Sequence, residues 1–155
     1  MQRYFVKRKE NDIVFLEESD FHHVKNVMRM NVCDNVEVVF NNTIYLASII
    51  SLDNVVKCKI IKEIETLNKD IPNIVIAQAL VKEQKMDYIL QKSCELGVDK
   101  IIPLITDRSV VKIDKNDTKK IDRWQKIVKE ASEQSKRSYI PKIENIMTIK
   151  NLANL

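Results

Sequence analysis

The chain has 155 residues, of which 45% are hydrophobic and 31% charged, and its formal net charge is +4. This composition is typical of a soluble globular protein with one medium domain or two small ones. The single glycine excludes the glycine-rich loops that bind mono- and dinucleotides, because those loops need several glycines close to the phosphates. The basic excess lies after residue 70, where 16 Lys or Arg stand against 11 Asp or Glu, and it is only weak support for an anionic partner.

Residues 1–70 have the pattern of a small β-barrel. Asn and Asp separate the later β-branched runs, and both residue types tolerate the left-handed turns that hairpins need, which predicts an antiparallel meander. Ser19 and Asp20 are predicted to cap a short helix that ends near residue 28. The predicted strands are residues 2–8, 13–16, 36–40, 43–50 and 55–64.

Residues 71–155 have the pattern of an α/β domain. The polar segment 67–72 ends in proline and marks the predicted domain boundary. A nearly continuous apolar run then predicts a strand covered on both faces, and a helix with Gly97 as its stop leads into a second strand. These three elements predict a βαβ unit with parallel strands, at residues 73–80, 82–96 and 100–106.

The rest of the chain continues the same alternation. A lysine-rich stretch, residues 112–120, leads into a second helix, and residues 143–147 are the expected third strand. A further helix is expected to begin near residue 150. The positions that recur at helical spacing are Met86, Ile89, Leu90, Ser93, Cys94 and Leu96 in the first helix and Ile121, Trp124, Val128, Ala131 and Ser135 in the second.

The cysteines, histidines and apolar runs indicate a cytoplasmic protein. Cys33, Cys58 and Cys94 lack C-x-x-C spacing and the two histidines, His22 and His23, are adjacent, so neither a disulfide framework nor a metal site is expected. No apolar run approaches about 18 residues and the N-terminus is charged, so neither a membrane span nor a signal peptide is expected.

One stripe of the second predicted helix has polar side chains of the kinds that bind ligands or transfer protons. Glu130, Glu133, Gln134 and Arg137 follow one another in steps of three and one. Such a stripe fits a polar-ligand or proton-handling site, and it equally fits a solvated face with ion pairs. Arg29 stands between two methionines at a predicted helix end. At that position its guanidinium is suited either to binding a phosphate or to capping the last carbonyls of the helix.

Several ordered motifs resemble the RsmE family of 16S ribosomal RNA methyltransferases. Their order and spacing agree with that family over nearly the whole chain. The motifs are Arg3–Val6, His23–Met30, Lys82–Asp87, Gln91–Val98, Ile102–Pro103, Arg108–Val110 and Trp124–Arg137, followed by Pro141.

The resemblance implies a fold, a reaction and partners. The implied fold is an α+β chain of two domains: a small PUA-like β-barrel that binds RNA, residues 1–70, and an α/β SPOUT methyltransferase domain with a parallel sheet, residues 71–155. The implied reaction moves a methyl group from S-adenosylmethionine to N3 of one uridine in 16S rRNA of the small ribosomal subunit. The implied complete protein is a homodimer that needs no metal.

The chain departs from the family pattern at two places. Cys33 and Asp34 stand where the family has a glycine, so the turn is expected from Asp34 and Asn35. The family's last third, with its glycine-rich loop and its trefoil knot, has no counterpart here. The SPOUT domain is therefore expected to be truncated, in a fragment of a longer protein or the product of a truncated gene. This chain is expected to be inactive alone and to hold no residues that bind S-adenosylmethionine.

The resemblance also singles out residues. Glu133 and Gln134 are weak candidates for orienting the uracil edge or for supporting the missing knot, and the residue that accepts the N3 proton is not identified. The alternative to an enzyme part is a non-catalytic module that binds rRNA. The basic residues expected to contact RNA are Arg3, Arg29, Lys85, Lys92, Arg108 and Arg137.

Overall fold

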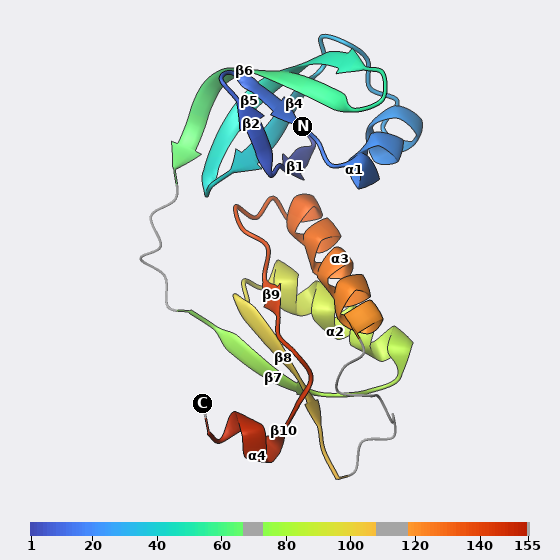
Figure 1. Cartoon of the computed structure of the whole chain (residues 1–155), viewed down its shortest axis with the longest axis vertical. Coiled ribbons are helices and arrows are strands. Elements are labelled where there is room, and N and C mark those ends of the chain that lie inside the picture. The colour runs from blue at the N-terminus through green and yellow to red at the C-terminus, as the bar shows by residue number, and fades with distance from the viewer. Residues whose placement is uncertain (67–72, 108–117, 155) are drawn as a thin grey trace. The chain divides into compact units, whose positions relative to one another are not determined.

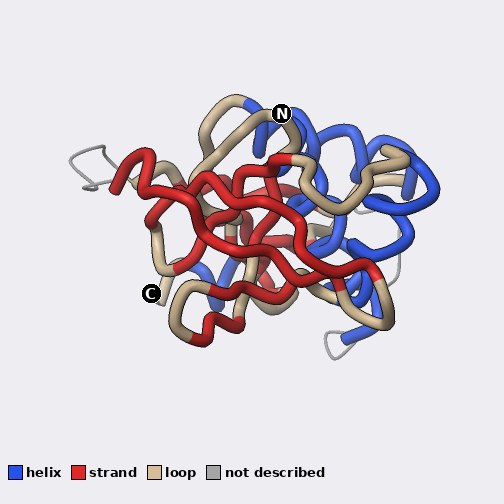
Figure 2. The backbone as a smooth tube through the Cα atoms, turned by 90° about the horizontal axis from the view of Figure 1, so that it is seen from above, coloured by secondary structure: helices blue, strands red, loops and turns tan. Residues whose placement is uncertain are grey.

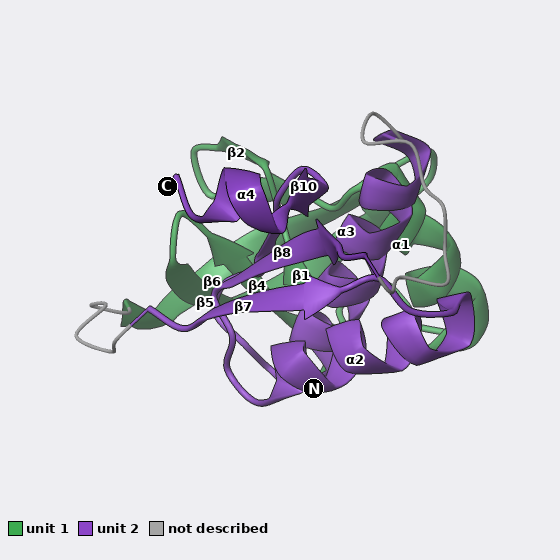
Figure 3. Ribbon diagram, turned by 90° about the horizontal axis from the view of Figure 1, so that it is seen from below, with its two compact units in different colours: residues 1–69 green, residues 70–155 purple. Residues whose placement is uncertain are grey.

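A computed structural model describes residues 1–66, 73–107 and 118–154 (Figures 1 and 2). The chain separates into two compact units, Met1–Lys69 and Asp70–Leu155, which Figure 3 shows in green and purple. The predicted boundary segment 67–72 lies outside the described residues, as does most of the lysine-rich stretch.

The first unit is built on a curled six-stranded sheet with the order β1-β4-β5-β6-β3-β2. The predicted meander is confirmed, because β4 pairs antiparallel with β5 and β5 with β6, while β1 joins β4 in parallel. The first predicted run, residues 2–8, contains β1 and only the first residue of β2, and these two strands lie at opposite ends of this order. The strands are β1 (Arg3–Phe5), β2 (Arg8–Glu10), β3 (Ile13–Phe15), β4 (Asn35–Phe40), β5 (Thr43–Leu52) and β6 (Val56–Thr66).

The core of this unit comes from alternate residues of its strands. Side chains of a strand point alternately to its two faces, so Val36 and Val38 of β4 enter the core while Glu37 between them does not. Tyr4, Val14 and Ile49 fill the same cluster and are fully buried. The outward-facing positions of β2 and β6 include charged residues, among them Arg8, Lys57 and Lys59.

The helix of the first unit differs from its prediction. It begins earlier, as α1 (Glu18–His22), and continues as a π-helical segment, η1 (His23–Val27). Its N-cap is Glu17, whose side chain makes no capping hydrogen bond, so the predicted cap at Ser19 and Asp20 is wrong. Asp20 is buried within the first turn and its backbone amide donates to the Glu17 carbonyl. The residue is therefore already inside the helix.

The turn before β4 also differs in detail. Cys33 has the left-handed backbone, at φ 76°, rather than Asp34 or Asn35, and Asn35 is already the first residue of β4. Asp34 still shapes the turn, because its carboxylate accepts a hydrogen bond from the Asn31 amide at 2.7 Å. An acidic side chain thus supports the turn, while the strained conformation falls on its neighbour.

The second unit contains the predicted βαβ arrangement. β7 (Val75–Ala79) and β8 (Lys100–Ile105) are parallel, and α2 (Glu83–Glu95) connects them. Gly97 follows α2 with φ +104°, as expected of a helix stop. β7 is the edge strand of the described sheet, and its Val75 is 49% exposed, so the described residues do not cover both faces of β7 as predicted.

The third predicted strand is two short strands. β9 (Lys142–Ile143) and β10 (Met147–Thr148) pair in parallel with the start and the end of β8. Between them Ile146 turns into the core, and the Glu144 carboxylate bonds the Lys142 and Lys100 ammonium groups, which lowers the pKa of Glu144. A final short helix, α4 (Ile149–Leu152), follows.

Two helices cover this sheet and pack against each other (Figure 1). α3 (Thr118–Gln134) buries Trp124, Val128 and Ala131, as the helical spacing predicted. These side chains share one apolar cluster with Met86, Leu90 and Cys94 of α2 and with Ile101 of β8. The polar faces of both helices are left at the surface.

The three cysteines provide a test of the burial pattern. Cys33 is exposed, while Cys58 and Cys94 are buried. Burial raises the pKa of Cys58 to about 12 and also raises the pKa of Cys94. Because only the thiolate is nucleophilic, the raised pKa and the burial of Cys58 and Cys94 are both expected to slow their alkylation at pH 8. We expect iodoacetamide at pH 8 to label one thiol per folded chain and three in urea, as counted by mass spectrometry.

The Cys33→Ser variant is the control for this labelling. It should show no rapid reaction when folded and two labelled thiols in urea. Rapid labelling of a second thiol in the folded wild-type chain would contradict the burial of Cys58 and Cys94.

Candidate nucleic-acid interface

Arg3 is held inside the first unit by an ion pair. It lies directly opposite Glu37 in the register of β1 and β4. Its guanidinium donates to the Glu37 carboxylate at 2.9 Å from Nε and 2.8 Å from Nη2, and the two side chains are only 10% and 15% exposed. The placement of Arg3 therefore favours a role in joining the two strands over a contact with RNA.

Arg29, unlike Arg3, lies at the surface. It follows η1, it is exposed, and its backbone has a left-handed conformation with φ 50°. Its side chain makes no hydrogen bond or ion pair with the described residues. The guanidinium is thus accessible to a phosphate, and Arg29 stays a candidate for RNA contact.

The basic residues of the second unit have different settings. Lys85 is exposed in the first half of α2, whereas Lys92 pairs with Glu95 at 2.7 Å, a contact that raises the pKa of Lys92. Arg137 donates to the Cys94 carbonyl at 2.6 Å and lies 4.1 Å from the Tyr139 ring. Because that carbonyl belongs to the last turn of α2, Arg137 caps this helix. Arg108 lies outside the described residues.

The polar stripe of α3 does not form one continuous face. Glu133 is buried, and its carboxylate lies 3.5 Å from the Lys129 ammonium. Glu130 and Gln134 on either side of it are exposed. Of the two candidates for orienting uracil, only Gln134 is therefore accessible from solvent.

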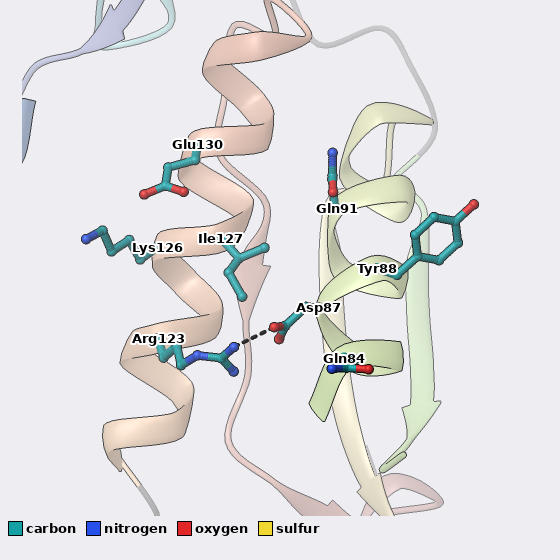
Figure 4. Close-up of a pocket in the computed structure, with 8 residues that line it drawn as sticks. All are labelled: Gln84, Asp87, Tyr88, Gln91, Arg123, Lys126, Ile127 and Glu130. Carbon is teal, nitrogen blue, oxygen red and sulfur yellow. Dashed lines mark hydrogen bonds and ion pairs between the residues drawn. The ribbon is translucent and has the colours of Figure 1, made fainter. Parts of the chain in front are cut away.

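The structure brings a different set of polar residues together, in a depression of about 600 Å³ that we call the α2–α3 groove (Figure 4). At its base the Arg123 guanidinium bridges Asp87 at 2.5 Å and Glu83 at 3.0 Å, which raises the pKa of Arg123. The lining residues are Gln84, Asp87, Tyr88, Gln91, Arg123, Lys126, Ile127 and Glu130.

Of the polar stripe predicted from the sequence, Glu130 lines the α2–α3 groove, and none of the described candidates for RNA contact or uracil orientation does. Lys126 and Glu130 make no hydrogen bond or ion pair with described residues, so the groove offers a cation and a carboxylate to a polar ligand. The Tyr88 ring points away from α3 in Figure 4, on the outer side of α2. The signal in the sequence was the spacing of three and four residues on the polar side of each helix, which does not show that these two sides meet.

Two general classes of site are absent from residues 1–66, 73–107 and 118–154. No cluster of three or more His, Cys, Asp or Glu side chains there is placed to hold a metal ion. None of the helices in these ranges has both the length and the apolar character of a membrane crossing.

Known families match both units. The family model of the RNA methyltransferase domain covers residues 68–155, and that of the RNA methyltransferase PUA domain covers residues 16–61. Ribosomal RNA small subunit methyltransferase E of Bacillus subtilis (strain 168) is 37% identical over 163 residues, which cover 98% of this chain and 62% of the relative.

Solved structures show the same fold. A ribosomal RNA small subunit methyltransferase E from Neisseria gonorrhoeae, bound to S-adenosyl methionine, is 30% identical with a TM-score of 0.87 and covers 98% of this chain and 64% of that protein. A putative methyltransferase from Legionella pneumophila, in complex with the same cofactor, has the same identity and TM-score and is covered to 65%. This chain thus spans less than two thirds of the length of these relatives.

Proposed function

Because this chain belongs to the RsmE family of ribosomal RNA methyltransferases, we propose that it forms the RNA-recognition part of an S-adenosylmethionine-dependent enzyme. The observation that carries the proposal is the match of RNA methyltransferase models to both units. The named relatives are methyltransferases, which favours an enzyme part over a module that only binds rRNA. The proposed substrate is N3 of a uridine in 16S rRNA. A homodimeric complete protein and a cytoplasmic location belong to the same proposal.

The reaction defines what this chain must do. N3 of uridine carries a proton that must leave, and the base must be unstacked from its neighbours, which costs least in a single-stranded loop. Holding the nucleotide in position accounts for much of the rate acceleration in such a methyl transfer. Arg29, Lys85 and Gln134 are exposed and suited to this holding. Arg3 and Glu133, which are buried in ion pairs, are not.

The described residues do not fit S-adenosylmethionine. The α2–α3 groove is an open depression with mostly charged and amide side chains, which offers no enclosed apolar surface to an adenine ring. Gly97, the one glycine, ends α2 and has open space where its side chain would be, so it does not line a close backbone cradle. We therefore place the donor site in the part of the relatives that this chain does not span.

A chimera tests this assignment. In it, this chain replaces the matching residues of the Bacillus subtilis relative, and the remainder of that relative follows. We expect calorimetry to show S-adenosylmethionine binding by the chimera and no binding by the 155-residue chain. We also expect the chimera to transfer tritiated methyl groups to small ribosomal subunits, and nucleoside mass spectrometry to find N3-methyluridine.

The two readouts separate the possible failures. The complete relative serves as the positive control in both assays. Binding of the donor by the 155-residue chain would overturn the location of the donor site. A chimera that binds the donor but transfers no methyl group to small subunits would overturn the proposed role of this chain in recognising rRNA.

A further inference from the structure

Three side chains lie side by side across the outer face of the first unit's sheet. Arg8 of β2 is paired with Phe15 of β3, and Phe15 is paired in turn with Lys57 of β6. Directly paired residues project from the same face. The next residues along, Val14 and Cys58, are buried in the core, so the three project outward. We call Arg8, Phe15 and Lys57 the outer row.

Within the outer row, the Arg8 guanidinium stacks on the Phe15 ring. The Arg8 guanidinium lies 4.2 Å from the centre of the Phe15 ring, a distance at which cation and ring attract. The Arg8 side chain is 65% exposed, so its far side is open to solvent. A depression of about 400 Å³ surrounds the row, lined by Lys7, Arg8, Phe15, Leu16, Glu17, Val55 and Lys57.

The charges around the outer row favour an anion. Glu10 and Glu17 are already paired, with Arg8 and Lys7 respectively. Lys57 is exposed and makes no hydrogen bond or ion pair with the described residues. Lys59 lies two residues further along β6, on the same face, and is likewise exposed and unpaired. Two ammonium groups are therefore available beside a flat aromatic layer.

We propose that the outer row and the neighbouring Lys59 bind single-stranded RNA, with one base stacked on Arg8 and Phe15 and phosphates at Lys57 and Lys59. Groups of this kind, aromatic platforms in a basic surface, bind unpaired nucleotides because each base has a face to stack and each linkage a charge. An acidic peptide would bind the ammonium groups but has no base to stack on the Phe15 ring. The inference rests on the proposed function and deepens it by assigning a contact in residues 1–66.

Fluorescence anisotropy with a fluorescein-labelled oligouridine of 12 nucleotides tests the proposal. We expect Phe15→Leu to weaken binding by the full chain about fivefold to tenfold, as loss of one stacked base does. Phe15→Tyr keeps the ring and should bind within about twofold of wild type. Lys57→Gln should lower the slope of log affinity against log salt by about 0.7, the effect of one phosphate contact to a single strand.

The matched control is Lys62→Gln, which removes the same charge from an exposed lysine further along β6. An equal loss in Lys62→Gln and Lys57→Gln would overturn the proposal, as would unchanged binding by Phe15→Leu. If the chain bound a polyglutamate peptide as tightly as the oligouridine, the outer row would be a site for an acidic protein instead of RNA. Circular dichroism verifies the fold of each variant. None of these measurements needs methyl transfer, so an inactive chimera leaves this result intact.

Discussion

Leu90→Ala is expected to lower the free energy of unfolding of the second unit by about 2–5 kcal/mol. Leu90 is fully buried and belongs to the cluster where α2 meets α3. Alanine removes apolar contacts and leaves a cavity that tightly packed neighbours fill only in part. Trp124, the only tryptophan, is 3% exposed in the same cluster, so urea unfolding followed by its fluorescence reports on this unit.

Leu96→Ala is the matched control, because it makes the same chemical change at the end of the same helix. Leu96 is 85% exposed, and its replacement should change the free energy of unfolding by less than about 0.5 kcal/mol. If the two substitutions had equal effects, the arrangement of α2 over the sheet would be wrong.

The same two leucines show what the sequence predicted about the helices. The spacing of apolar residues correctly placed Met86, Leu90 and Cys94 in the core. It also included Leu96, which is exposed because a step of two residues from Cys94 turns about 200° around the helix axis, away from the buried face. Spacing therefore predicts the buried face of a helix only where the steps are three or four residues.

The candidate site was less predictable, because its contacts join residues far apart in the sequence. Arg3 meets Glu37 only after β1 pairs with β4, and Arg123 meets Asp87 only after α3 packs on α2. A single sequence shows the charge of each partner but not which partner it finds. The outer row was missed for the same reason, since its members come from three strands that share a face only through their register.

Arg3→Gln is expected to destabilise the first unit by about 3 kcal/mol, because it leaves the nearly buried Glu37 carboxylate without its guanidinium partner. Glu37→Gln should have a similar effect by leaving Arg3 uncompensated. The double variant should lose less free energy of unfolding than the two single variants lose together, since neither charge then remains unpaired. Urea unfolding followed by circular dichroism measures all three.

RNA binding distinguishes this structural role of Arg3 from the contact that the family motif implied. If the ion pair with Glu37 is its function, Arg3→Gln binds the labelled oligouridine as wild type does under conditions where it is folded, whereas Arg29→Gln binds more weakly. A normal unfolding curve for Arg3→Gln together with weaker RNA binding would reverse this assignment. The two arginines have the same charge and both belong to motifs that resemble the family, so what distinguishes them in the structure is burial: Arg29 is exposed, and Arg3 is already paired with the Glu37 carboxylate.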